Sequence, residues 1–247
     1  MTPGYELLLP PRGKEPAPLL LILPILGRLL CLPDFWLEKR IARFFVKRGF
    51  ACAIVQRQFF LFQSGAGELQ LNEYITSTVR LARQTLDTLS THPDIRSDQI
   101  ASLGISFGGI INTLLCAQDP RIRAAVIALA GGPIPEILAT SWDPLVRYYY
   151  RSVKKGMGWK KEEFIPKLSA LVENPLEAAP KVDAQKILMI IAKYDQVVRY
   201  PYAESLREKM GLPETVYLPC GHYTSLLVLP VLERQALHFY QRKFQTA

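Results

Sequence analysis

The segment Gly104–Gly108 reads Gly-Ile-Ser-Phe-Gly and lies between two apolar runs, residues 100–103 before it and 109–116 after it. The first run predicts a buried strand and the second a helix. A Gly-x-Ser-x-Gly turn between a strand and a helix is a nucleophile elbow, in which the chain turns so sharply that the flanking positions must lack bulk. The pattern therefore predicts that Ser106 stands at a helix N-terminus, with an exposed hydroxyl beside backbone N–H groups that can stabilise an oxyanion.

A serine hydroxyl is a weak nucleophile at neutral pH and needs a base, which one of the three histidines must supply. His92 lies in a polar stretch upstream of the serine, and His238 lies inside a C-terminal amphipathic segment. His222 directly follows the strand-like run 215–218, in the kind of loop where sheet enzymes place chemistry. We therefore predict that His222 is the base.

The acid that orients the base is expected between the serine and the histidine in chain order. The apolar run 187–192 is typical of a buried parallel strand, and Asp195 follows its end. Asp183 precedes that strand and is expected at the opposite edge of the sheet, whereas Asp143 falls in a segment that looks like an insertion. The order Ser106, Asp195, His222 thus predicts a catalytic triad.

These motifs together resemble the α/β-hydrolase superfamily, most closely its branch of dienelactone-hydrolase-like and prolyl-oligopeptidase-like single-domain hydrolases. The resemblance is carried by residues 94–109, 119–127, 194–198 and 220–223. It implies an α/β fold with a mostly parallel central sheet, helices on both faces and a helical cap insertion at 134–180, all in one domain of residues 1–247. True dienelactone hydrolases use a cysteine where this chain has Ser106, so their activity is not implied.

The two backbone donors of an oxyanion hole are expected after the serine and after an early strand. The elbow assigns the first to the N–H of Phe107. The second is expected in the loop after the strand-like run 19–23, where the superfamily often has His-Gly or Gly-Gly and this chain has neither. Pro24 has no N–H to donate, which leaves Leu26, our choice, and Ile25 as the alternative.

Strand-like and helix-like segments alternate along the chain, which predicts a parallel sheet covered on both faces. The expected strands are 5–9, 19–23, 51–55, 99–104, 124–130, 186–192 and 215–218, and the expected helices are 35–47, 71–89, 107–117, 201–210 and 225–244. The 247 residues suit one large domain and are few for two.

Aromatic residues in the expected cap and after strand 51–55 are candidates for lining a substrate pocket. They are Phe59, Phe60, Trp142, Tyr149 and Trp159. The alternative for each is ordinary packing of the cap onto the sheet.

Charge and cysteine usage point to no cofactor, metal or nucleic acid. The net charge of +8 is read as a solvated surface, since no nucleic-acid-binding motif accompanies it. The four cysteines are scattered without metal-ligand spacing and read as free thiols, which favours the cytoplasm. The apolar run 19–26 is too short to span a bilayer, so no stable membrane insertion is expected. The oligomeric state stays open.

The sequence therefore predicts a serine hydrolase acting on a small-molecule carboxylic ester through an acyl-enzyme intermediate. Two alternatives remain: a peptidase or amidase with the same triad, and a non-catalytic binding protein on a hydrolase fold.

Overall fold

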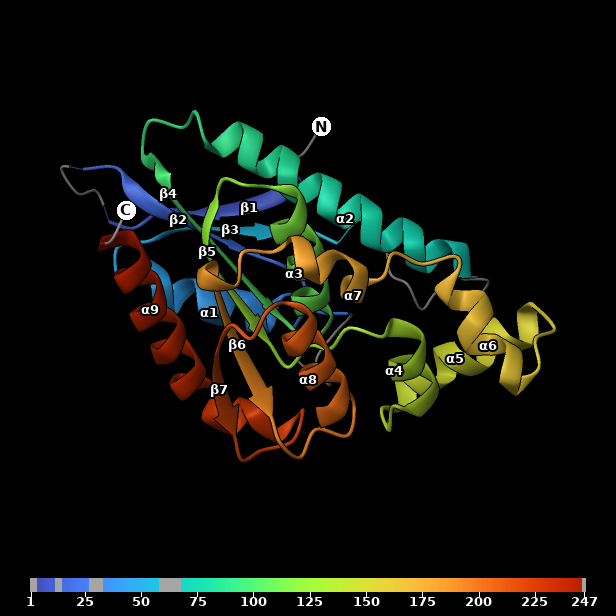
Figure 1. Ribbon diagram of the computed structural model, residues 1–247. Helices are drawn as coiled ribbons and strands as arrows, with labels where there is room; N and C mark the ends of the chain where they lie inside the picture. Colours follow the sequence, from blue (N-terminus) through green and yellow to red (C-terminus); the bar gives the residue numbers. More distant parts are fainter. Residues whose placement is uncertain (1–3, 12–14, 27–32, 58–67, 246–247) are drawn as a thin grey trace.

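One sheet of seven strands runs through the part of the chain that the structure describes, residues 4–11, 15–26, 33–57 and 68–245 of a computed structural model (Figure 1). The strands lie in the order β1-β3-β2-β4-β5-β6-β7. Their bounds are Tyr5–Leu8 (β1), Ala17–Ile22 (β2), Ala51–Val55 (β3), Ile95–Ile105 (β4), Ile122–Ala128 (β5), Ile187–Ala192 (β6) and Glu214–Leu218 (β7). Strand β1 is antiparallel to β3, and every other neighbouring pair is parallel.

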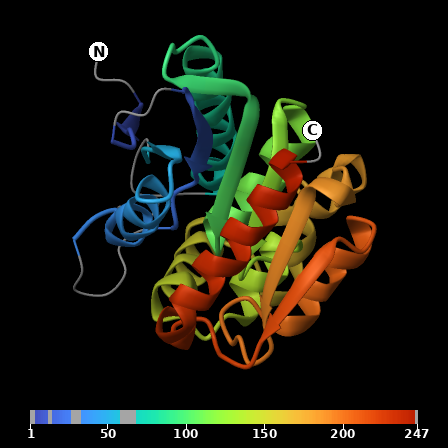
Figure 2. The same cartoon turned by 90° about the vertical axis from the view of Figure 1, so that its left-hand side faces the viewer.

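Helices cover both faces of this sheet because its central strands are apolar on both sides. Along β2, Leu19 and Leu21 face the core under one set of helices, whereas Leu20 and Ile22 face the other. The first set is α2 (Glu68–Leu89), α3 (Phe107–Gln118) and α8 (Tyr200–Lys209). The second set is α1 (Trp36–Val46) and α9 (Leu229–Gln245), and Figure 2 looks onto the face that α9 crosses.

Each predicted strand and helix is present, and two bounds differ in an informative way. Strand β4 begins at Ile95 because its first residues pair with Ala17 and Pro18 before a register shift in β2. The predicted helix 225–244 begins only at Leu229, after a 3₁₀ turn, η3 (Thr224–Val228). Ser225 is tied back into the preceding loop, its N–H bonded to Gly221 O at 3.0 Å, which delays the helix.

The apolar run 19–26, predicted to hold a strand rather than a membrane segment, overlaps β2, which is buried inside the sheet. Within the described ranges, no helix combines the length and the apolar character that crossing a membrane requires.

Residues 134–180, which we call the cap segment, lie between β5 and β6 and are helical. The segment contains α4 (Ile134–Thr140), α5 (Pro144–Gly156), α6 (Lys161–Ser169) and α7 (Pro175–Ala178). Helices α4, α5 and α6 extend beyond the sheet on the right of Figure 1. Helix α5 begins where it does because Asp143 caps it, its Oδ1 accepting from the N–H groups of Leu145 and Val146 at 2.8 Å.

Candidate active site

Ser106 stands at the turn between β4 and α3, in a backbone conformation that few non-glycine residues adopt. Its φ is 55° and its ψ is −121°, and its N–H donates to the carbonyl of Ala128 at 2.8 Å. A Cβ on Gly104 would lie 2.1 Å from the Gly108 carbonyl oxygen, and one on Gly108 would lie 2.9 Å from that of Leu23. The turn can therefore close only with glycine at both positions, which explains the pattern around the serine.

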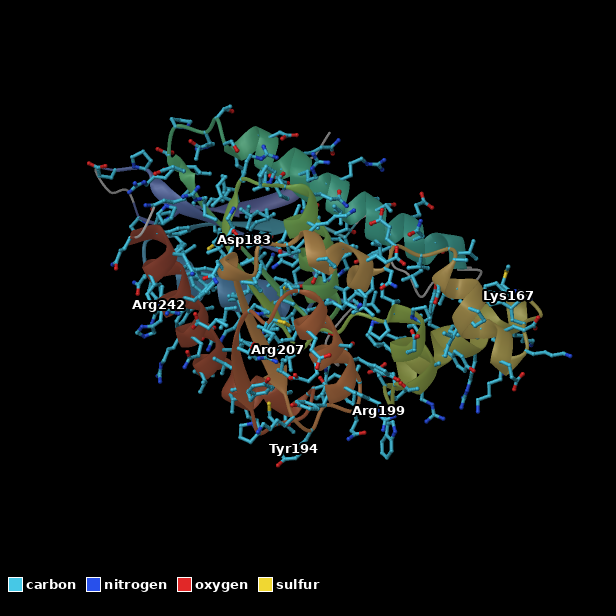
Figure 3. The ribbon with its side chains drawn as sticks, viewed as in Figure 1. Lys167, Asp183, Tyr194, Arg199, Arg207 and Arg242 are labelled. Atoms are coloured by element: carbon cyan, nitrogen blue, oxygen red, sulfur yellow. The ribbon has the colours of Figure 1, made fainter. Side chains whose placement is uncertain are left out.

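His222 connects this serine to Asp195 by two hydrogen bonds. Its Nε2 lies 2.9 Å from Ser106 Oγ, and its Nδ1 lies 2.7 Å from Asp195 Oδ2. The three residues follow β4, β6 and β7, and since these strands are parallel their carboxyl ends meet at one edge of the sheet. Tyr194, the exposed neighbour of Asp195, marks this edge at the lower end of the molecule in Figure 3.

The Asp195 carboxylate is buried and held from both sides. Its Oδ1 accepts from the backbone N–H groups of Val197 at 2.7 Å and Val198 at 2.8 Å, which leaves Oδ2 to face the His222 ring. The side chain of Asp195 is 2% exposed and that of His222 is 12% exposed. Because one carboxylate oxygen is fixed by backbone donors, the other can orient the imidazole so that its Nε2 faces the serine as an acceptor.

The loop that carries His222 is itself braced. Thr224 Oγ1 accepts from the Gly221 N–H at 2.8 Å, and Ser225 Oγ donates to the His222 carbonyl at 2.5 Å. These bonds hold the histidine backbone on both sides of the residue.

The two backbone N–H groups predicted to bind an oxyanion are those of Phe107 and Leu26. The N–H of Phe107, in the first turn of α3, and that of Leu26 have no acceptor among the described residues. The N–H of Ile25, by contrast, donates to the carboxylate of Glu38 at 3.0 Å. The alternative between Ile25 and Leu26 is therefore weighted towards Leu26.

Ser106 and His222 lie on the wall of an apolar cavity of about 140 Å³. The sheet side contributes Leu129 and Ile110, and the cap segment contributes Ile134, Ile137, Leu138, Val146 and Tyr149. Ile25, Leu26 and Phe107 also line it. The polar lining side chains are Ser106, Asp143, His222, Tyr223 and Ser225. The cavity thus places a serine hydroxyl and an imidazole beside a largely hydrocarbon surface.

Of the three predicted pocket aromatics that the structure describes, one lines this cavity. Tyr149 is buried and lines the wall. Trp142 is 72% exposed and does not line the cavity, because it precedes the capped end of α5 and points to solvent. Trp159 packs edge-on against Phe164 inside the cap segment instead, with ring centroids 6.2 Å apart. Phe59 and Phe60 lie outside the described residues.

Sequence reasoning missed the contact between Tyr223 and Asp143. The Tyr223 hydroxyl donates to Oδ2 of Asp143, the carboxylate that caps α5. Burial, with the nearby Asp143 charge, raises the pKa of Tyr223, so its hydroxyl stays a donor. The contact joins the loop of His222 to the start of α5, and only the adjacency of Tyr223 to the predicted base hinted at it.

Cys220, two residues from His222, is buried. Burial raises the pKa of this thiol, and the charge of Asp195 acts in the same direction. A thiol kept protonated is a poor nucleophile, so the reactive candidate at this edge is Ser106.

Comparisons of the sequence with known proteins give little information about function. No family model matches the chain. The uncharacterised protein YdjC of Bacillus subtilis (strain 168) is 29% identical over 102 residues, which cover 41% of this chain and 86% of YdjC.

Solved structures match over nearly the whole chain at low sequence identity. The α/β hydrolase GrgF from Penicillium sp. sh18 matches with a TM-score of 0.68 at 18% identity, over 96% of this chain and 92% of that chain. An acetyl xylan esterase from Paenibacillus sp. R4 has a TM-score of 0.70 at 18% identity, over 94% and 77%. The acylaminoacyl peptidase of Pyrococcus horikoshii has a TM-score of 0.70 at 16% identity, over 97% of this chain, which spans only 39% of that peptidase. The fold of this chain is therefore the α/β-hydrolase fold.

Proposed function

We propose that this protein is a serine hydrolase that cleaves carboxylic esters, with Ser106 as nucleophile, His222 as general base and acid, and Asp195 as the residue that orients His222. The observation that carries the proposal is the pair of hydrogen bonds, 2.9 Å and 2.7 Å, that joins these side chains at the wall of an apolar cavity. A binding protein would have no need for a serine held at a strained turn and bonded to a buried histidine–carboxylate pair.

The proposed reaction has two halves. Ser106 Oγ attacks the acyl carbon as His222 Nε2 takes the hydroxyl proton, and the oxyanion that forms is held by the N–H groups of Phe107 and Leu26. When the tetrahedral intermediate collapses, the alcohol leaves with the proton from His222. Water then attacks the acyl-enzyme by the same route in reverse, releasing the acid and restoring Ser106.

An ester with an apolar acyl part is the substrate class that the cavity favours. Apart from the five polar side chains named above, the lining residues within the described chain are hydrocarbon or aromatic. Asp143, the one carboxylate among them, is engaged by Tyr223 and by the start of α5. No charged group is thus left in this lining to bind a peptide terminus. We therefore rank a peptidase below an esterase as the candidate function.

We further propose that the cap segment, residues 134–180, covers the site within a single domain and selects substrates. Its residues Ile134, Ile137, Val146 and Tyr149 form one wall of the cavity. The triad and the oxyanion donors recognise only the reacting group, so discrimination must come from such walls.

The test is turnover of p-nitrophenyl esters of increasing acyl length, beside the matching anilides, by the wild type and by Ser106→Ala. We expect hydrolysis of the esters and a loss of about 10⁴–10⁶-fold in kcat in Ser106→Ala, because a triad acts as a unit. Circular dichroism of the variant controls for folding. Turnover of the anilides in preference to the esters would support the amidase alternative, and undiminished hydrolysis by Ser106→Ala would overturn the proposal.

A further inference from the structure

Two buried side chains, those of Glu38 and Arg57, are hydrogen-bonded to the loop that follows β2. Glu38 of α1 accepts the N–H of Ile25 at 3.0 Å, and Arg57, just after β3, donates from Nη1 to the carbonyl of Ile25 at 2.9 Å. Both polar groups of one residue are therefore bonded to side chains from two other parts of the chain.

The bond from Arg57 fixes a peptide unit that matters for the proposed site. The carbonyl of Ile25 and the N–H of Leu26 belong to the same planar unit, and the described chain has no cis peptide bond. In a trans peptide the two groups point in opposite directions. While Arg57 holds the carbonyl, the Leu26 N–H points away from Arg57, and a cation on the carbonyl also polarises that N–H into a stronger donor.

The loop is placed against the elbow by packing as well. A Cβ on Gly108 would lie 2.9 Å from the carbonyl oxygen of Leu23 and 3.0 Å from that of Pro24. Leu26 and Phe107 line the same cavity as Ser106. The N–H that Arg57 orients therefore belongs to a residue that lines the same cavity as the serine.

The pair of Glu38 and Arg57 is not expected to add much to the stability of the fold. The side chains of Arg57 and Glu38 are 4% and 3% exposed, and Arg57 Nη1 lies 3.7 Å from Glu38 Oε1. Removing two charges from water costs so much that a buried ion pair is often no better than apolar residues of the same size. Arg57 also pairs with Asp34 and lies over the ring of Phe35 at 4.2 Å, so its guanidinium is held in one place.

We infer that Glu38 and Arg57 are positioning residues that set the oxyanion hole. Glu38 occupies the Ile25 N–H, and Arg57 orients the Ile25–Leu26 peptide, so that Leu26 is the second oxyanion donor. The inference rests on the proposed serine-hydrolase function and adds to it a role for two residues that touch no substrate.

Arg57→Met and Glu38→Met are the test variants, with Arg57→Lys and Glu38→Gln as conservative partners. The matched control is Glu233→Met, because Glu233 is also a buried glutamate paired with an arginine, Arg40, at 3.3 Å. Burial raises the pKa of both Glu38 and Glu233. Glu233 lies on α9 and does not line the cavity. The readouts are kcat and KM for a short p-nitrophenyl ester, the affinity for a trifluoromethyl ketone as inhibitor of that reaction, and the melting temperature of the free protein.

An oxyanion donor acts in the transition state, so we expect kcat to fall about 10- to 100-fold in Arg57→Met and Glu38→Met with KM nearly unchanged; complete loss of one donor costs about 10²–10³-fold. Affinity for the ketone, which binds as an oxyanion, should fall in parallel. Arg57→Lys and Glu38→Gln should recover part of the loss, because each keeps a donor or an acceptor. Glu233→Met should leave kcat and ketone affinity at wild-type values, and its melting temperature measures the effect on stability of losing a buried glutamate elsewhere in the fold.

The inference is overturned if Arg57→Met and Glu38→Met match Glu233→Met in kcat and ketone affinity, or if they change KM alone. If one methionine variant does not fold, the other decides. If neither folds, wild-type kcat and ketone affinity in both Arg57→Lys and Glu38→Gln would overturn the inference. Reaction of the wild type with a fluorophosphonate distinguishes failure of the proposed function from failure of this inference. An unlabelled wild-type Ser106 contradicts the proposed function, whereas a labelled Ser106 with unaffected variants contradicts this inference alone.

Discussion

Oδ2 of Asp195 lies 2.7 Å from Nδ1 of His222, although 27 residues separate them in the chain. The other carboxylate oxygen is taken by two backbone N–H groups, so Asp195 presents a single oxygen to the ring. This relationship fixes which nitrogen of His222 faces Ser106, and it makes the carboxylate testable separately from the serine.

Asp195→Asn should keep the fold and lose about 10⁴-fold in kcat, because an amide facing Nδ1 no longer favours the tautomer whose Nε2 accepts the serine proton. Steady-state kinetics with a short ester, beside a melting curve, measures this. Near-wild-type kcat in Asp195→Asn would move the acid to another residue.

The cavity wall should control the choice of acyl group. Tyr149→Leu replaces a buried wall residue by a smaller one, and we expect it to change the kcat/KM ratio of bulky to short esters by about 10–200-fold, the range of a hydrophobic pocket contact. Trp142→Ala is the control, since Trp142 is 72% exposed and does not line the cavity. An equal shift in both variants would mean that the wall does not select the substrate.

The contact between Tyr223 and Asp143 should keep α5 seated beside the site. Tyr223→Phe removes a hydrogen bond to a carboxylate, worth about 1.5–3 kcal/mol, so we expect KM for bulky esters to rise by about 10- to 100-fold with a smaller change in kcat. Tyr217→Phe is a matched control, because the Tyr217 hydroxyl donates to Glu204 at 2.9 Å and lines no part of the cavity. Identical kinetics for the two variants would show that the contact does not shape the site.

A pH-dependent contribution to stability is expected from Asp119. Burial alone would raise the pKa of this carboxyl, but the hydrogen bonds from Arg121, at 2.8 and 2.6 Å, outweigh burial and hold the pKa below its usual value of 3.8. A carboxyl with a depressed pKa stabilises the folded state above pH 3.8 and loses that contribution as the pH falls through its folded pKa. Asp119→Asn should therefore lower stability by about 1.5–3 kcal/mol at neutral pH.

Denaturant unfolding at several pH values measures this difference. The difference in the free energy of unfolding between wild type and Asp119→Asn should become smaller as the pH falls below 3.8. The control is Asp98→Asn, since Asp98 is 70% exposed in its pair with Arg96 and should contribute little at any pH. A difference that stays constant with pH would show that the ion pair with Arg121 is not its cause.

The strands and helices were predictable because their signals are local. The apolar run of β6 and the glycine-flanked serine between β4 and α3 each specify their own conformation, and strand–helix alternation specifies a parallel sheet. The start of α9 was not predictable, because it depends on bonds that Ser225 makes to the preceding loop.

The site was predictable where chain order and strand ends were enough, and unpredictable where it depended on which way a side chain faces. Ser106, Asp195 and His222 each follow a strand, and parallel strands bring their ends together. Trp142 lies in the loop before α5 and is exposed, whereas Tyr149 lies inside α5 on its buried side, and the aromatic residue type alone does not distinguish them.

The burial of a charged residue could not be predicted from the sequence either. Glu38 is a carboxylic acid that is only 2% exposed, and the group that it binds is a backbone N–H from another loop. A contact of that kind leaves no pattern in the residues themselves.

The most direct test of the central claim is mass spectrometry of the wild-type protein after treatment with a fluorophosphonate. Only a serine activated by its neighbours attacks such a phosphorus atom readily, so we predict one adduct, on the peptide that contains Ser106, and none in Ser106→Ala. An adduct on another residue, or none on the folded wild type, would contradict the assignment of Ser106 as the nucleophile.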